Sequence, residues 1–261
     1  MGGVRGGENF ALNVAGWHKI PAGSYGATGD ARSHIRLAPM TGAVENIGWA
    51  DEESFYFDLI SSCVQAGIGT SIGDGTPDAK LLYGIEAVRS AGVKAALFIK
   101  PYPNDQLIER FTWGEDVAEC AGVDIDSWRI ATMRGKAHLE RKGERELAAL
   151  KSYFSHKGLP FAIKGIFTQH DVQIAQALMP DIVYVSNHGG RVDTERGSTA
   201  HFLAQNASTL KKCSGELWVD GGVRCMADVK KALSWGADVV LAGRPFATAL
   251  CQGKPFGGVL P

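Results

Sequence analysis

Residues 216–244, ELWVDGGVRCMADVKKALSWGADVVLAGR, contain two short apolar runs separated by a segment with helical periodicity. Each apolar run is followed by glycine and then by an arginine. A strand, a helix and a second strand in this order predict parallel strands that are joined by a helical crossover. This unit decides the fold, because the same alternation continues toward the N-terminus.

Eight apolar runs with strand character recur along the chain. They cover residues 35–40, 68–73, 94–100, 123–127, 160–166, 181–187, 216–222 and 238–244. Between them, helical periodicity covers residues 53–67, 78–92, 105–122, 143–158, 171–181 and 226–238. Strands and helices in this number and order predict an α/β fold of the (β/α)8 TIM-barrel type.

A doubly wound open sheet is the alternative architecture. It favours a G-x-G-x-x-G turn after the first strand, and residues 35–48 contain none. We therefore expect one barrel domain at 35–261, without internal linkers, and we interpret residues 1–34 as a glycine-rich lead-in segment.

Composition excludes several functional classes. The net charge of −1 gives no basic field for nucleic acid, and no run approaches the 18 or so apolar residues of a membrane span. The five cysteines show no C-x-x-C spacing, so we expect neither a disulfide framework nor a metal site. A reducing, cytoplasmic location fits this cysteine usage.

Polar side chains stand where strands of the predicted barrel end, and a barrel builds its active site at that face. His188 and Arg191 follow the sixth run, although the same residues could form only a turn. Asp124 and Asp126 alternate at the end of the fourth run, so both would face one side. A carboxylate there could orient His188 as a general base, or cap the next helix.

Lys164 lies among apolar residues at the end of the fifth run. Alternation places Ala162, Lys164 and Ile166 on one face of this strand. A buried ammonium group needs an anionic partner, which a cofactor or intermediate could supply. A lysine that only extends to solvent is the simpler interpretation.

Glycine turns with an arginine follow the seventh and eighth runs. Phosphate sites of barrels form after these two strands, where glycine N–H groups approach the oxygens and arginine adds charge-assisted bonds. The residues that we expect to take part are Gly221, Gly222, Arg224, Gly243 and Arg244. The residues alone thus predict a barrel that binds a phosphorylated ligand with a base above it.

Taken together, SNHGGR with the following Asp193, DGGVR and GADVVLAGRPF resemble the FMN-dependent α-hydroxy-acid dehydrogenase and oxidase family. The resemblance is strong over 160–253 and weaker over 1–130. It implies FMN as cofactor and a small carboxylate, by default a 2-hydroxy acid, as substrate. It implies that His188 is the base, that Asp126 orients it and that Arg191 binds the substrate carboxylate.

The resemblance also implies the flavin contacts. Lys164 would lie near N1 and the C2 carbonyl of the flavin, and Asp220 would bind the ribityl chain. Gly222, Arg224, Gly243 and Arg244 would hold the phosphate. The remaining residues implied to contact the cofactor are Pro39, Met40, Thr41, Ser71 and Ser186.

The sequence departs from the family pattern on the substrate side. Lys100 stands where the family has a tyrosine after the third strand, unless Tyr102 takes over that role. VDID replaces the usual Thr-Val-Asp, and the long loop that supplies a second arginine is largely absent, with Arg134 as a candidate substitute. We therefore count Lys100 among the substrate residues.

The chain also departs from the family pattern at its ends, so we interpret it as a fragment or as a short form completed by a partner. The final outer helix would then be missing. An apolar patch would remain, which would favour a homo-oligomer. The side chains that we expect to face it are Leu241, Phe246, Leu250 and Phe256.

Two other functions remain open at this point. One is a flavin-dependent isomerase of the type 2 isopentenyl diphosphate isomerase kind, which the altered third and fourth strand ends would allow. The other is a non-catalytic barrel that binds a phosphate ligand.

Overall fold

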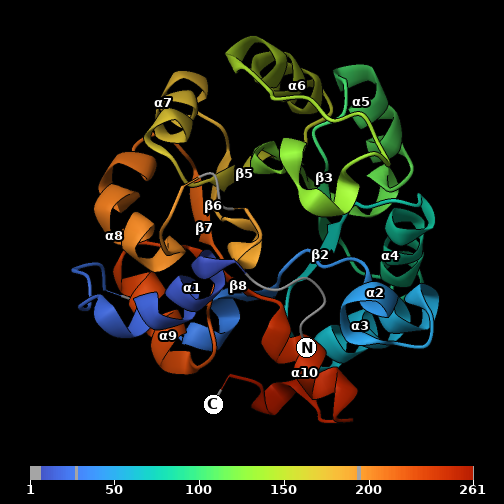
Figure 1. Cartoon of the computed structure of the whole chain (residues 1–261), viewed down its shortest axis with the longest axis horizontal. Coiled ribbons are helices and arrows are strands. Elements are labelled where there is room, and N and C mark those ends of the chain that lie inside the picture. The colour runs from blue at the N-terminus through green and yellow to red at the C-terminus, as the bar shows by residue number, and fades with distance from the viewer. Residues whose placement is uncertain (1–6, 27–28, 193–194, 261) are drawn as a thin grey trace.

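The computed structural model describes residues 7–26, 29–192 and 195–260. Eight parallel strands form one sheet in the order β1-β8-β7-β6-β5-β4-β3-β2. A single parallel bridge between Arg36 and Gly69 joins β1 to β2 and brings the two edges of the sheet together. The predicted (β/α)8 barrel is therefore confirmed, and Figure 1 shows helices arranged around the strands.

The strands are short and almost entirely buried. They are β1 (Ile35–Leu37), β2 (Thr70–Gly73), β3 (Ala95–Ile99), β4 (Ala118–Asp124), β5 (Phe161–Ile166), β6 (Ile182–Val185), β7 (Glu216–Val219) and β8 (Val239–Ala242). The helices are α1 (Glu8–Lys19), α2 (Ala43–Ile47), α3 (Glu52–Gln65), α4 (Ala79–Ser90), α5 (Asn104–Thr112), α6 (Glu144–His156), α7 (Gln169–Leu178), α8 (Thr199–Leu210), α9 (Met226–Ser234) and α10 (Arg244–Cys251).

Two apolar layers hold the barrel together. The inner layer is built around three aromatic rings, those of Phe98, Tyr184 and Trp218, whose centroids lie 5.4 to 6.3 Å apart in edge-to-face contact. The larger outer layer packs the helices against the strands. Because the interior is filled with side chains, the barrel leaves space for a ligand only at its ends.

The structure corrects the predicted face of Ile166. Gly165 has a φ of +100°, and the pairing of β5 with β6 shifts register between Lys164 and Ile166. This irregularity breaks the alternation of side chains. Ala162 consequently belongs to the inner layer, whereas Ile166 packs into the outer one.

One predicted helix extends too far, and one crossover helix was missed. The segment at 105–122 is not one helix, because α5 ends at Thr112 and β4 already begins at Ala118. Helix α8, between β6 and β7, had not been predicted. Its sequence, TAHFLAQNASTL, contains many small and polar residues, so its apolar face is not apparent from the sequence.

Helix α1 packs against the barrel and covers the turns that follow β6 and β7. The side chain of Asn13 donates a hydrogen bond to Asn187 Oδ1 at 2.7 Å, and the Trp17 indole donates one to the Gly221 carbonyl at 2.8 Å. Figure 1 shows α1 beside α8 and α9. Part of the predicted lead-in therefore shapes the carboxyl end of the barrel.

The apolar patch expected after β8 is covered by the chain itself. Leu241, Phe246 and Phe256 are buried, and the rings of Phe246 and Phe256 lie 5.0 Å apart. Helix α10 and the 3-10 turn at Phe256–Gly258 pack near α3, while Leu250 is only half-buried. The exposed patch that we expected at these residues is thus absent from the described structure.

Candidate active site

A cavity opens at the carboxyl ends of the strands, where the sequence places its polar residues. The sequence-predicted residues that line it come from most of the strand ends: Pro39, Met40, Thr41, Lys100, Lys164, His188, Arg191, Asp220, Gly221, Gly222, Arg224, Gly243 and Arg244. Strand pairing brings them together, because parallel strands end on one side of a sheet.

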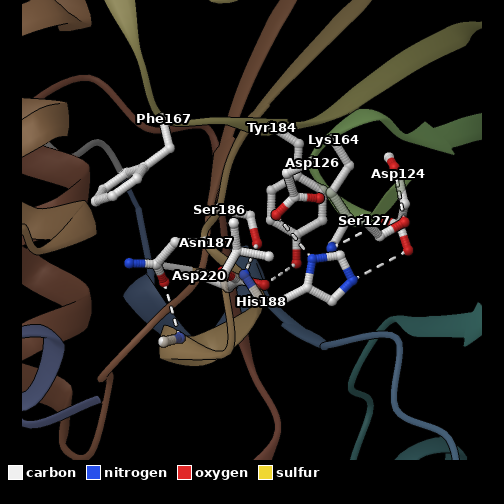
Figure 2. Close-up of polar contacts among 12 residues, drawn as sticks. Asp124, Asp126, Ser127, Lys164, Phe167, Tyr184, Ser186, Asn187, His188 and Asp220 are labelled. Atoms are coloured by element: carbon white, nitrogen blue, oxygen red, sulfur yellow. Dashed lines mark hydrogen bonds and ion pairs between the residues drawn. The ribbon is translucent and has the colours of Figure 1, made fainter. Parts of the chain in front are cut away.

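His188 occupies a strained position directly after β6. Its φ is +53°, in the left-handed region that non-glycine residues seldom adopt. Its Nδ1 atom lies 2.8 Å from Asp126 Oδ2, and its backbone N–H donates to the Ser186 hydroxyl at 3.2 Å. An ionised carboxylate only accepts hydrogen bonds, so a proton on Nδ1 faces Asp126, while Nε2 lies 3.0 Å from Lys100 Nζ and 3.3 Å from Asp124 Oδ2. Figure 2 shows the imidazole between Asp126 and Asp124.

The two aspartates of the fourth run reach the site from different elements. Asp124 is the last residue of β4, whereas Asp126 belongs to the following 3-10 turn at Ile125–Arg129. Asp126 packs against β5 at Gly165, where an added Cβ would lie 2.4 Å from Asp126 Oδ1. The glycine therefore provides the space that lets Asp126 reach His188.

Asp124 lies between two buried lysines. Its Oδ2 atom is 2.6 Å from Lys100 Nζ, and its Oδ1 atom is 2.9 Å from Lys164 Nζ. Burial opposes ionisation of Asp124, but the charges of Lys100 and Lys164, with His188, outweigh it and hold its pKa well below the usual range.

Lys164 is charged despite its burial. Removal from water favours the neutral amine, but the carboxylates of Asp124, Asp126 and Asp220 together raise the pKa of Lys164 above its ordinary value. The ammonium group also lies 5.4 Å from the Tyr184 ring. This lysine thus points into the barrel and does not extend to solvent.

Three arginines line the opposite part of the cavity. Arg191 donates to Asn46 Oδ1 at 2.9 Å, and Arg224 donates to the Val223 carbonyl at 2.8 Å. Arg244 lies 4.3 Å from the Phe10 ring. Burial, with the charges of Arg191 and Arg224, lowers the pKa of Arg244 to about 10. Arg191 and Arg224 thus repel Arg244, and an anion placed beside Arg244 would relieve this repulsion.

The glycines after β7 and β8 serve the packing of the chain as well as the cavity. A Cβ on Gly222 would lie 2.2 Å from the Asn13 carbonyl oxygen, and one on Gly221 would lie 2.5 Å from Thr199 Oγ1. A Cβ on Gly243 would meet Met40 Sδ at 2.8 Å. Because these glycines have no side chain, α1, α8 and Met40 can approach them closely. The sequence analysis did not predict this packing role.

Several predicted residues do not line the cavity in the described part of the chain. Ser71 is buried within β2, and Ser186 acts on the backbone of His188. Tyr102 is buried, with Arg110 4.8 Å from its ring, and burial raises its pKa to about 12. Arg134 is exposed. Tyr102 and Arg134 are thus not among the residues that line the cavity, and Asp193 lies outside the described residues.

Other residues line the cavity although sequence reasoning missed them. Asp74 follows β2 and accepts a hydrogen bond from the Lys100 backbone at 3.1 Å, so the rule for strand ends could have identified it. Lys80 reaches the cavity from α4 and pairs with Glu45 at 3.1 Å, and Phe10 reaches it from α1. Residues that reach the cavity from a helix do not follow a strand, so the rule for strand ends cannot identify them.

No helix among residues 7–26, 29–192 and 195–260 has the length and apolar character needed to cross a membrane. The cavity as a whole combines one oriented imidazole with six cationic side chains, from Lys80, Lys100, Lys164, Arg191, Arg224 and Arg244. Such a site can bind an anionic molecule and remove a proton from it.

Comparisons with known proteins agree with this geometry. The family model of FMN-dependent dehydrogenases matches residues 78–257. L-lactate oxidase of Lactobacillus jensenii is 30% identical over 180 residues, which are 66% of this chain and 43% of that protein. Rat (Rattus norvegicus) 2-hydroxyacid oxidase 2 is 38% identical over 97 residues, 37% of this chain and 27% of that protein. The matched segments thus span less than half of these relatives.

Solved structures support the fold. Mandelate oxidase with benzoyl-formic acid superposes with a TM-score of 0.72 at 20% identity, over 97% of this chain and 81% of that one. The flavin-binding domain of baker's yeast flavocytochrome b2 gives a TM-score of 0.67 at 22% identity, over 94% and 69% of the two chains. With the family match over residues 78–257, the chain belongs to the FMN-dependent dehydrogenase family.

Proposed function

We propose that this protein binds FMN at the barrel mouth and oxidises a small 2-hydroxy acid. The observation that carries the proposal is the orientation of His188, whose Nδ1 atom is held by Asp126 while Nε2 is turned toward a cationic cavity. The isomerase and the non-catalytic barrel are not favoured, because the matching family consists of dehydrogenases.

The residues of the cavity fit FMN. The phosphate would take the place among Arg224, Arg244 and the Gly222 and Gly243 backbone, where an anion relieves repulsion between the arginines. Asp220 Oδ1 is buried and has no hydrogen-bond partner among the described residues, so it can accept a bond from a ribityl hydroxyl. Lys164 would stabilise negative charge on the ring, and Pro39, Met40 and Thr41 would border it.

FMN would supply the acceptor for two electrons. The chain supplies the acid–base chemistry, because Nε2 of His188 can take a proton from the substrate. Asp126 stabilises the imidazolium that results, and Arg191 pairs with the substrate carboxylate in bidentate fashion. The relatives that act on lactate and on other 2-hydroxy acids support this substrate class.

A visible spectrum of the purified protein tests the proposal. We expect flavin absorbance, after addition of FMN if needed, and anaerobic bleaching by L-lactate, glycolate or mandelate. A protein that binds no FMN would contradict the cofactor assignment. A protein that binds FMN but is not bleached by any of a broad panel of 2-hydroxy acids would contradict the substrate class.

We further propose a cytoplasmic location and a homo-oligomeric state. The five cysteines are free, which suits a reducing compartment. Val64 on α3 and Leu82 on the neighbouring α4 are exposed and could contact a second copy. Sedimentation of the purified protein tests the oligomeric state.

A further inference from the structure

Lys100, the first residue after β3, contacts both the base and a carboxylate. Its Nζ atom lies 3.0 Å from His188 Nε2 and 2.6 Å from Asp124 Oδ2. The side chain is only 8% exposed, and it lines the cavity. Its position is fixed at the backbone too, because the Lys100 N–H donates to Asp74 Oδ2 at 3.1 Å.

The surroundings hold the Lys100 ammonium group beside Nε2 of His188. Asp124 is shared by Lys100 and Lys164, so one carboxylate balances two cations. Asp74 is held in turn by a buried ion pair with Arg110 at 2.6 Å. A flexible side chain is thereby fixed in one place, which is typical of a group that acts on a ligand.

The distance between Lys100 and His188 sets where a substrate oxygen can bind. Two nitrogen atoms 3.0 Å apart can both lie within hydrogen-bond distance of one oxygen atom placed beside them. A hydroxyl at that point donates its hydrogen to Nε2 and accepts one from Nζ. The substrate hydroxyl then makes one hydrogen bond to Lys100 and one to His188, in place of the direct contact between these two side chains.

We infer that Lys100 is a catalytic residue that binds the C2 oxygen of the substrate, and that Asp124 is the positioning residue that holds it there. The inference rests on the proposed function and names the group that recognises the reacting oxygen. Arg191 binds the carboxylate at the other end of the same small molecule.

The proposed reaction oxidises the C2 alcohol of the substrate to a carbonyl group. The C2–H and O–H bonds of the alcohol break, and a C2=O double bond forms. One proton goes to His188 Nε2, while two electrons and the other proton go to FMN, which is the oxidant. Negative charge rises on the C2 oxygen before the double bond is complete, and the Lys100 ammonium stabilises it there.

Pyruvate and propionate provide a test that needs no turnover, because both are carboxylates and they differ at the C2 oxygen. We expect the FMN-loaded protein to bind pyruvate more tightly than propionate, measured by perturbation of the flavin spectrum. Lys100→Met should reduce this preference by about tenfold to hundredfold, the loss of one charge-assisted hydrogen bond. Affinity for propionate should change little.

Lys142→Met is the matched control. Lys142 is also a buried lysine paired with a glutamate, Glu140 at 3.3 Å, but it does not line the cavity. This variant should keep the preference for pyruvate. If Lys100→Met does not fold, Lys100→Gln, which retains a neutral donor, should lose a smaller part of the preference.

Either of two results would overturn the assignment of Lys100. One is a Lys100 variant that keeps the full preference for pyruvate, and the other is a native protein that shows no preference. The proposed function fails separately, if no FMN binds or no 2-hydroxy acid bleaches the flavin. Calorimetric titration with pyruvate and propionate then still tests Lys100, because it needs no flavin signal.

Discussion

The carboxylate of Asp126 occupies the space in which a side chain at residue 165 would lie. A Cβ built on Gly165 comes within 2.4 to 2.7 Å of three Asp126 atoms, and Gly165 has a φ of +100°. The same glycine thus breaks the alternation of β5 and allows Asp126 to reach His188 Nδ1 at 2.8 Å. The geometry of β5 and the orientation of His188 therefore both depend on Gly165.

Gly165→Ala should therefore harm both stability and catalysis. We expect a loss of about 1–3 kcal/mol for the left-handed backbone, and more for the clash with Asp126. Urea unfolding measures the first effect, and the rate of flavin reduction measures the displacement of Asp126. Gly158→Ala is the control, because Gly158 has a φ of +70° but nothing within 4 Å of its Cβ position. Equal losses in the two variants would show that the contact with Asp126 is unimportant.

His188→Gln should leave FMN bound and slow flavin reduction by about 10²-fold or more, the scale of general-base catalysis. Glutamine can still donate to Asp126 but cannot take up a proton. Anaerobic stopped-flow reduction with a substrate of the native protein measures the rate. His156→Gln, on the exposed face of α6, should behave like the native protein. Native-rate reduction in His188→Gln would leave His188 with a structural role only.

Arg244→Ala should weaken FMN binding by about tenfold to hundredfold, since one charge-assisted bond to phosphate contributes about 1.5–3 kcal/mol. Fluorescence titration of the apoprotein with FMN measures the dissociation constant. Arg145→Ala removes an equal charge from the exposed face of α6 and should have no such effect. Unchanged affinity in Arg244→Ala would place the phosphate elsewhere.

Asp124→Asn should change how stability depends on pH. The pKa of Asp124 is depressed in the folded protein, so its ionised form stabilises the fold above the unfolded value of about 4. This contribution is lost as the pH falls through the folded pKa. The difference in urea midpoint between native protein and variant should thus be largest near neutral pH and shrink below about pH 4. A difference that stays constant down to pH 2 would contradict the depressed pKa.

Asn13→Ala should destabilise the protein by about 1–3 kcal/mol, because it leaves buried polar groups without partners. Asn13 Oδ1 accepts the Thr199 N–H at 3.0 Å, and its Nδ2 donates to Asn187 Oδ1 at 2.7 Å. Urea unfolding measures the loss. A variant as stable as the native protein would mean that α1 contributes little to the barrel.

The sequence was sufficient to predict the barrel, because alternation of buried strands and amphipathic helices is a local property. It was insufficient for β4, whose start at Ala118 lies within a stretch that had been interpreted as helix. It also misplaced Ile166, since the break at Gly165 accompanies a close contact with Asp126, from the turn that follows β4. Patterns along one strand do not reveal such contacts between strands.

The site residues also divide into those that a pattern along one strand predicts and those that depend on contacts between elements. Strand ends predicted that His188, Lys164 and the pair Asp124 and Asp126 lie at one face, because parallel strands end together, and the family resemblance singled out Asp126. The chain does not reveal that Lys100 and Asp124 form a pair, since this depends on the packing of β3 beside β4. Lys80 and Phe10 were missed because they enter the cavity from helices.

The position of α1 has a consequence for the order in which the protein is made. Trp17 bonds to Gly221, and the two residues are 204 positions apart. The ribosome therefore releases α1 long before its partners on β6 and β7 exist. Closure of β1 onto β8, which pairs Ile35 with Val240, must wait equally long. Contacts of such long range form slowly, so the anchoring of α1 and the assembly of the cavity belong to a late stage of folding.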